Sequence, residues 1–138
     1  MKAARRVISV LVTAILIGTT LLVAASSAPA RQRCTLKGTA ADDPMVDTGG
    51  ASVICAKAGN DSVEAGVQGD RVLGGKGDDR LEGNDGRDVV VGGLGTDTVV
   101  TADGVGGNDR AVGGRGQDTC YIDRGDRTKG CETKHIVG

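Results

Sequence analysis

The sequence predicts an all-β fold, a parallel β-roll of about five 18-residue coils with Gly-rich turns. Three observations predict it. The 138 residues include 24 Gly but no Phe or Trp. Asp recurs every nine residues, and a small or aliphatic residue follows two positions after each recurrence. Aromatic side chains supply much of the apolar area of ordinary cores, so this composition excludes a conventional globular core.

The nine-residue spacing rests on a Gly-rich unit. Complete copies of Gly-Gly-x-Gly-x-Asp occupy 74–79, 92–97 and 113–118, and a near copy occupies 83–88. The sixth-position Asp falls at 61, 70, 79, 88 and 97. The register then slips by three residues and resumes at Asp109 and Asp118. Toward the N-terminus, Asp43 and Ser52 continue the count.

Each nonapeptide divides into a turn and a short strand. Gly permits the positive φ angles that the Gly-rich half needs to turn the chain. The following triplet forms a strand whose middle side chain points to one face. Two nonapeptides then give one coil, and stacked coils enclose a thin core. The inward side chains expected for this core are Met45, Ile54, Val63, Val72, Leu81, Val90, Val99, Ala111 and Cys120.

Stacking also gathers the lattice residues on two edges. One edge collects Asp43, Asp61, Asp79, Asp97 and Asp118, and the other collects Ser52, Asp70, Asp88 and Asp109. Carboxylates about 5 Å apart repel one another by roughly 3–4 kcal/mol at an effective dielectric near 20. A divalent cation reverses that sign. Ca²⁺ fits best because it accepts about 6–8 oxygen ligands in flexible geometry. Mg²⁺ prefers a small octahedron and Zn²⁺ prefers Cys and His ligands.

These residues carry a family resemblance. The pattern resembles the RTX, or hemolysin-type, calcium-binding nonapeptide repeat, over residues 55–121 and in degraded form over 34–54. The resemblance implies a parallel β-roll with Ca²⁺ in its turns. The ligands that it implies are the carboxylates of Asp61, Asp70, Asp79, Asp88, Asp97, Asp109 and Asp118. Backbone carbonyls of the complete turns are expected to join them, at Gly75, Gly77, Gly93, Gly95, Gly114 and Gly116.

Some turns depart from the repeat pattern. Gln68 replaces a Gly before Asp70, Ser52 replaces an Asp, and Val105 occupies a Gly position before Asp109. Ala56 and Lys57 replace both leading glycines before Asp61. Sites that use these turns are expected to be weak or empty, and the strongest pair on one edge is Asp79 with Asp97.

The first 30 residues are typical of a secretory signal peptide. Basic residues precede an apolar run over 7–25, and Ala28-Pro29-Ala30 provides a small-residue cleavage site. A retained membrane anchor is the alternative, because a mainly apolar run of 19 residues is marginally long enough to span a bilayer. With cleavage, the protein is extracellular and has no membrane partner. The expected divisions are 1–30 signal peptide, 31–54 degenerate N-terminal cap repeats, 55–121 repeat β-roll and 122–138 C-terminal cap and tail.

Four cysteines in a secreted chain predict two disulfides. Three pairings are possible. We favour Cys34–Cys55 and Cys120–Cys131, which are local in sequence and lie at the two ends of the lattice. Each would hold a terminal coil against fraying. Zinc binding is the alternative for four cysteines, but no pair has Cys-x-x-Cys spacing.

The remaining side chains favour a non-enzymatic protein. Residues 31–138 carry 14 Lys and Arg against 18 Asp and Glu, which excludes a basic nucleic-acid footprint. His135, the only His, is expected in a disordered tail, and no catalytic motif occurs. The basic residues indicate a solvated face, neutralisation of neighbouring Asp by Arg80 or Arg115, or a surface for an anionic polymer.

The sequence thus favours a secreted protein that binds calcium ions and folds when it does so. The alternatives are a structural or adhesive cell-surface solenoid in which metal is incidental, with a cell-surface or matrix polymer as partner, and an accessory module of an enzyme. Oligomeric state and biological role are not predicted.

Overall fold

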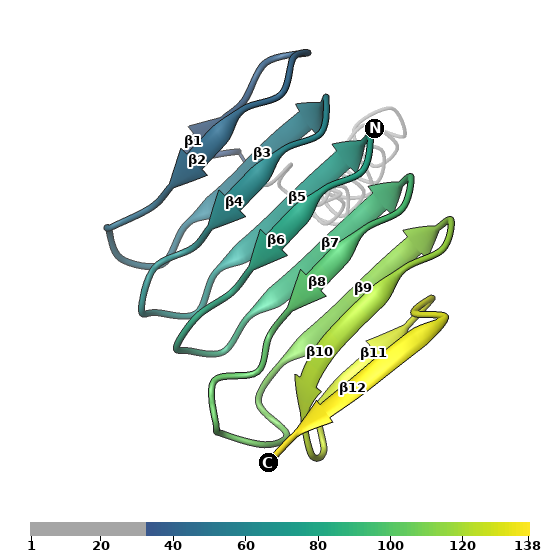
Figure 1. The fold of residues 1–138 in the computed structure, drawn as a ribbon. Coiled ribbons are helices and arrows are strands. Elements are labelled where there is room, and N and C mark those ends of the chain that lie inside the picture. The colour runs from purple at the N-terminus through teal and green to yellow at the C-terminus, as the bar shows by residue number, and fades with distance from the viewer. Residues whose placement is uncertain (1–32) are drawn as a thin grey trace, which may run out of the picture. The chain divides into compact units, whose positions relative to one another are not determined.

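The computed structural model describes residues 33–138, so the predicted signal segment lies outside the described residues. No helix in the described part is long and apolar enough to cross a membrane. All of its regular structure is strand, arranged as a succession of stacked coils that each contribute one strand to each of two sheets, from the N-terminal coil at the upper left to the C-terminal coil at the lower right (Figure 1). The predicted parallel β-roll is confirmed.

The two sheets are parallel and six-stranded. Sheet A contains, in spatial order, β1 (Leu36–Lys37), β3 (Val53–Ala58), β5 (Arg71–Lys76), β7 (Val89–Leu94), β9 (Arg110–Arg115) and β11 (Arg127–Lys129). Sheet B contains β2 (Pro44–Val46), β4 (Ser62–Glu64), β6 (Arg80–Glu82), β8 (Thr98–Val100), β10 (Thr119–Asp123) and β12 (Thr133–Val137). Neighbours in each sheet lie one coil apart in the sequence.

The core is the predicted aliphatic column. All nine inward residues are buried, from Met45 at 7% exposure to Val72, Val90 and Cys120 at 0%. The register aligns them across the strands, as in the pairing of Val72 with Val90. Parallel pairing places identical positions of successive coils about 4.8 Å apart, so the inward side chains stack on their equivalents without any aromatic ring.

The two halves of a coil have strands of unequal length, which the nine-residue period does not predict. In sheet B, β2, β4, β6 and β8 have three residues, whereas β5, β7 and β9 of sheet A have six and include the Gly-Gly pair that was expected to turn the chain. The second glycine of each pair has a positive φ, for example 132° at Gly93. This glycine bends the strand without ending its pairing. The turn into sheet B therefore shortens to three residues such as Gly77-Asp78-Asp79.

The C-terminal segment is a sixth coil, where about five coils and a disordered tail were expected. Residues of β11 pair with β9, and all five residues of β12 pair with β10. His135 lies on β12, with its ring stacked on Tyr121 at a centroid distance of 4.7 Å. The expectation of a disordered His135 was wrong because Thr133–Val137 repeats the strand register of the coil before it.

Both expected disulfides are present. Cys34 is bonded to Cys55 and Cys120 to Cys131, which places one cross-link at each end of the stack. Every cysteine of the chain is thereby paired, so the zinc alternative has no thiolate available.

Candidate functional site

The lattice aspartates are buried inside the turns rather than displayed on them. Seven are at most 3% exposed: Asp61, Asp70, Asp79, Asp88, Asp97, Asp109 and Asp118. Each of the seven directly precedes a strand, which belongs to sheet B on one edge and to sheet A on the other. The fold therefore brings together all seven predicted aspartates in two columns, one on each edge of the stack.

One oxygen of each carboxylate joins the coils. The backbone N–H of Asp61 donates to Oδ1 of Asp79 at 2.9 Å, and that of Asp79 donates to Oδ1 of Asp97 at 2.9 Å. The other edge repeats the pattern, with Asp70 donating to Asp88 at 2.7 Å. Each bond spans 18 residues, and it spans 21 where the three-residue register slip intervenes. These bonds fix each carboxylate between two successive turns.

The other carboxylate oxygen is left without a partner. Among the lattice aspartates, the Oδ2 atoms that are buried and accept no hydrogen bond belong to Asp61, Asp79, Asp88, Asp97, Asp109 and Asp118. Asp70 differs, because its Oδ2 accepts the N–H of Gly66 at 3.1 Å. A buried carboxylate oxygen without a donor is costly, so it requires a proton or a cation. This donor set, hard anionic oxygen in repeated pairs, fits Ca²⁺.

The first glycine of the complete turns makes room for that oxygen. A Cβ at Gly74 or Gly92 would lie 2.3 Å from Oδ2 of the aspartate five residues later. A Cβ at Gly92 would also lie 2.6 Å from the carbonyl oxygen of Gly113 in the next coil. Only a residue without a side chain leaves the carboxylate and the neighbouring carbonyl in this arrangement.

The other predicted glycines place their carbonyls between coils. The Gly75 carbonyl oxygen lies against Gly93, and the Gly77 carbonyl oxygen lies against Gly95, one coil farther along. Gly93 and Gly95 repeat the contact with Gly114 and Gly116. Nowhere in residues 33–138 do three His, Cys, Asp or Glu side chains converge on one point. A cation held by two aspartates in these turns would therefore take its remaining oxygens from backbone carbonyls or water.

Burial and mutual repulsion shift the titration of the columns. Desolvation, followed by repulsion from Asp109 and Asp70, raises the pKa of Asp88 to about 7. Desolvation raises the pKa of Asp97 to about 6, with repulsion from Asp79 and Asp118 adding to it. Desolvation likewise raises the pKa of Asp109 to about 6, and it raises the pKa of Asp79. The middle of each column thus resists ionisation when no cation is bound.

A second series of hydrogen bonds joins the turns on the edge that contains Asp79. In this series each side chain accepts an N–H from the following coil, whereas the lattice aspartates accept from the preceding coil. The side-chain oxygen of Asn60 accepts the N–H of Asp78 at 2.9 Å, and Oδ1 of Asp78 accepts the N–H of Thr96 at 2.7 Å. Asp42 begins it by accepting from Asn60 at 2.7 Å. Asx side chains readily bond nearby backbone groups in turns, which explains their use here.

Three further aspartates, which the sequence analysis missed, organise the turn that contains the register slip. Asp123 accepts the N–H groups of Asp103 and Gly104, and Asp126 accepts those of Gly107 and Asp109. Burial opposes ionisation of Asp103, but hydrogen bonds led by the Val105 N–H lower its pKa overall. Backbone donors satisfy these carboxylates, and the side-chain amide of Asn108 also donates to Asp103. The signal for them was the Asp-Arg-Gly-Asp run at 123–126, which falls off the nine-residue count.

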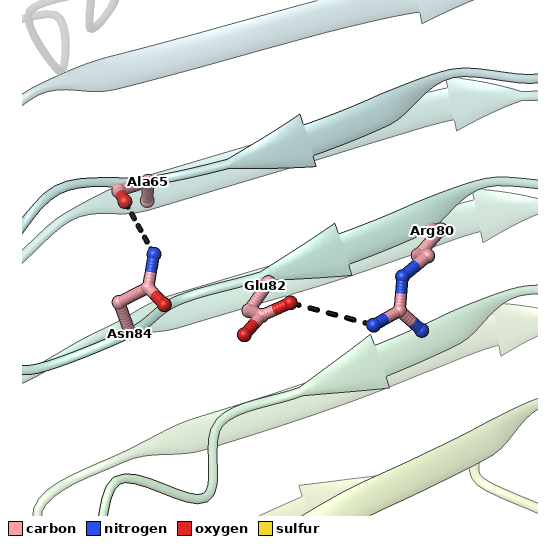
Figure 2. A network of polar contacts seen from close by, with 4 residues as sticks. All are labelled: Ala65, Arg80, Glu82 and Asn84. Atoms are coloured by element: carbon pink, nitrogen blue, oxygen red, sulfur yellow. Dashed lines mark hydrogen bonds and ion pairs between the residues drawn. The ribbon is translucent and has the colours of Figure 1, made fainter. Parts of the chain in front are cut away.

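Arg80, which was expected to neutralise a neighbouring aspartate, forms an ion pair with Glu82 instead. Arg80 Nη2 lies 3.4 Å from Oε2 of Glu82 on the outer face of sheet B, and both side chains point away from the turns (Figure 2). Nearby, the Asn84 side-chain amide donates to the carbonyl of Ala65 at 2.6 Å and links two coils (Figure 2). Arg80 is 60% exposed, so its ion pair is worth little to stability.

Comparison with known families agrees with this geometry. Residues 64–99 and 101–128 match the family described as the RTX calcium-binding nonapeptide repeat (4 copies). These two segments are RTX-type repeats. The two matched segments are separated at residue 100, directly before the register slip that the structure accommodates as a longer turn. Neither a curated protein nor a solved structure matches the chain.

The RTX repeats indicate a calcium-binding protein. An RTX β-roll with aspartate-rich turns is a structural calcium-binding fold, and such folds are generally non-enzymatic. RTX calcium-binding repeats are also typical of secreted bacterial proteins. The matched segments include six of the seven lattice aspartates, all except Asp61, whose turn lacks both leading glycines.

Proposed function

We propose that Ca²⁺ ions bind between successive turns on both edges of the roll and that their binding drives its folding. The carboxylate ligands are Asp61, Asp70, Asp79, Asp88, Asp97, Asp109 and Asp118. The carbonyls of Gly75, Gly77, Gly93, Gly95, Gly114 and Gly116 complete the coordination. The six buried Oδ2 atoms without a donor carry this proposal, because a cation removes both their desolvation cost and their mutual repulsion.

Folding follows from where the ligands lie in the sequence. Each Ca²⁺ would join residues 18 or 21 positions apart, so no site exists before two coils have stacked. Binding free energy is then folding free energy. Each completed coil also presents half of the next site, which makes binding cooperative along the stack. Extracellular Ca²⁺ sites commonly have dissociation constants of about 10⁻⁴–10⁻³ M, which keeps the chain loose inside a cell and folded outside it.

We place the mature protein outside the cell, without enzymatic activity. The alternative, a cell-surface solenoid that needs no metal, is favoured by one observation: Oδ1 of each lattice aspartate already binds a backbone N–H of the preceding coil. Those bonds hold the stack in either case. The two functions differ in whether the roll survives when its carboxylates are ionised and Ca²⁺ is withheld.

Calorimetric titration with Ca²⁺ and circular dichroism in chelator test the proposal together, at neutral pH with disulfides intact. We expect several Ca²⁺ per chain, cooperative binding, and a loss of β signal in excess chelator that Ca²⁺ restores and Mg²⁺ does not. An unchanged β signal in chelator would support the metal-independent solenoid, and absence of any heat with Ca²⁺ would exclude both the sites and the coupling.

A further inference from the structure

The outer face of sheet A carries only positive charge. None of its six strands contains Asp or Glu. Its cationic residues are Lys37, Lys57, Arg71, Lys76, Arg110, Arg115, Arg127 and Lys129. All of them are exposed except Arg71, which is half-buried. The net negative charge of the chain is therefore confined to the turn edges, the connecting segments and sheet B.

Apart from Lys57, whose Nζ donates to the carbonyl of Gly38, these cations have no hydrogen-bond or ion-pair partner among the described residues. Among the described residues the one ion pair is Arg80 with Glu82, on the opposite sheet. The acidic columns next to sheet A are buried in the turns, where their Oδ1 atoms already accept backbone N–H groups. A face of unpaired Lys and Arg of this kind attracts external anions.

The register arranges the face in rows that run across the strands. Arg71, Val89, Arg110 and Arg127 form one row, because each pairs with the next in sheet A. Leu73, Val91, Val112 and Lys129 form the adjacent row. Successive positions lie about 4.8 Å apart. A mainly aliphatic row is thus bordered by a row of arginines, and Lys76 and Arg115 lie in another row on its far side.

The two rows enclose a shallow cavity. Its volume is about 410 Å³, and its lining includes Arg71, Arg110, Lys129, Val91 and Val112. A second cavity of about 220 Å³ shares Arg110 with the first, and its lining includes Arg87 and Arg127 together with the lattice residues Asp88 and Asp109. The half-buried valines form an apolar floor, and the guanidinium and ammonium groups form the rims.

We propose that this face binds a linear acidic polysaccharide, laid across the strands along the axis of the stack. Charge complementarity favours a polyanion, and Arg forks bind carboxylates and sulfates in a bidentate manner. The rows extend over several coils, as a linear ligand requires. The aliphatic floor suits the C–H faces of sugar rings. No Phe, Tyr or Trp lies on the strands of sheet A, so the stacking platforms typical of single-stranded nucleic-acid sites are missing there.

The shape of the face distinguishes this ligand from a membrane. Val91 and Val112 are half-buried and line the groove together with the longer cationic side chains of Arg71, Arg110 and Lys129. Peripheral membrane sites instead project apolar side chains into the headgroup region. Leu94 is the one large apolar side chain exposed on the strands of sheet A, so the face offers little apolar surface for insertion into a bilayer.

Titration calorimetry of the calcium-loaded protein with chondroitin sulfate oligosaccharides tests the proposal. We expect binding that weakens as salt rises, because bound counterions are exchanged for protein cations. The double variant Arg110→Gln with Arg127→Gln should lose at least tenfold in affinity. Arg80→Gln is the matched control, since it removes an exposed arginine from the other sheet, and its affinity should stay within twofold of wild type. Neutral dextran should not bind.

Circular dichroism of each variant in Ca²⁺ verifies that the roll is intact. Equal losses for the sheet A double variant and Arg80→Gln would overturn the proposal, because they would show attraction to net charge rather than a site. Tighter binding to oligodeoxythymidylate or to anionic phospholipid vesicles than to the oligosaccharide would assign the face to a different partner. Absence of binding to a folded, calcium-loaded protein would leave the face without this function.

Discussion

The substitution Asp97→Asn distinguishes two effects of the buried charge on stability: destabilisation of the metal-free protein and stabilisation of the Ca²⁺-bound protein. In wild type, Oδ1 of Asp97 accepts the N–H of Asp79 at 2.9 Å, and its Oδ2 is buried without a partner. An asparagine keeps the first acceptor and removes the charge. Leaving a buried charged group unpaired costs about 1–3 kcal/mol or more, so the metal-free variant should be about 1–3 kcal/mol more stable than wild type. The repulsion from Asp79 and Asp118 disappears as well.

The same substitution should have the opposite effect when Ca²⁺ is present. Asp97 lies between two coils, so its loss removes a ligand from the site on each side. A tenfold weakening of each site corresponds to about 1.4 kcal/mol, or about 3 kcal/mol for both. Urea unfolding at pH 7.5 in chelator and in saturating Ca²⁺ measures both changes. Asp85→Asn, at an exposed turn position outside the columns, is the control with the same charge change and should alter neither value.

The reasoning requires the two signs to differ. If Asp97→Asn destabilised the protein equally in chelator and in Ca²⁺, the carboxylate would be acting only as a hydrogen-bond acceptor. The idea of a repulsive column relieved by a cation would then be wrong.

Three further predictions follow from the buried columns and the glycines. The pKa of Asp88 is about 7 and the pKa values of Asp97 and Asp109 are about 6, all above the ordinary 3.8. Between pH 3.8 and these values, the folded state therefore binds more protons than the unfolded state. In chelator, the free energy of unfolding should therefore be highest near pH 4 and fall as pH rises to 7. Saturating Ca²⁺ should reverse that trend, and a metal-free stability that increases over this range would refute it. Gly92→Ala should destabilise by at least about 2 kcal/mol, because its Cβ would lie 2.3 Å from Oδ2 of Asp97. Gly104→Ala, which has φ 89° and open space, should cost only about 1 kcal/mol in the same thermal melts, and equal costs would exclude the steric reason. Lys57→Gly should raise stability by about 1 kcal/mol, because Lys57 has φ 86° in the register position of Gly75. The control Lys76→Gly, in the next strand, should lower stability by about the amount that glycine costs in a strand. A loss of stability in Lys57→Gly would show that the bond from its side chain to the Gly38 carbonyl outweighs the backbone strain of its positive φ.

The stacking of the coils could be predicted from the sequence because it rests on a strict period. A residue at a fixed offset from each lattice position must point to the same side in every coil. Met45 at one end and Cys120 at the other are therefore buried, as Val90 in the middle is. The same period also predicts the two disulfides, because it places Cys55 and Cys120 on strands next to the ends of the stack.

The orientation of the aspartates could not be predicted from spacing alone. The sequence indicated that carboxylates stack, but the period does not reveal that one oxygen binds a backbone N–H of the preceding coil. It also does not reveal the long strands of sheet A, which depend on the positive φ of a single glycine such as Gly93. Both features are three-dimensional consequences of two turns being in contact.

The last coil was missed for a different reason. Its aspartates, Asp123 and Asp126, follow the register slip and lie off the nine-residue count, although they accept backbone N–H groups as lattice residues do. Glu132 even replaces an aspartate, since its Oε2 accepts the N–H of Asp118 at 2.8 Å. A repeat search that requires a fixed period and one residue type stops before this coil.

A crystal structure of the protein grown with Ca²⁺, with an anomalous difference map at a wavelength where calcium scatters anomalously, tests the account most directly. Peaks should lie between the turns that carry Asp79 and Asp97, and at equivalent places along both edges, each in contact with carboxylate oxygens from two coils. A folded roll in that crystal with hydrogen-bonded columns and no anomalous peak between its turns would contradict the account.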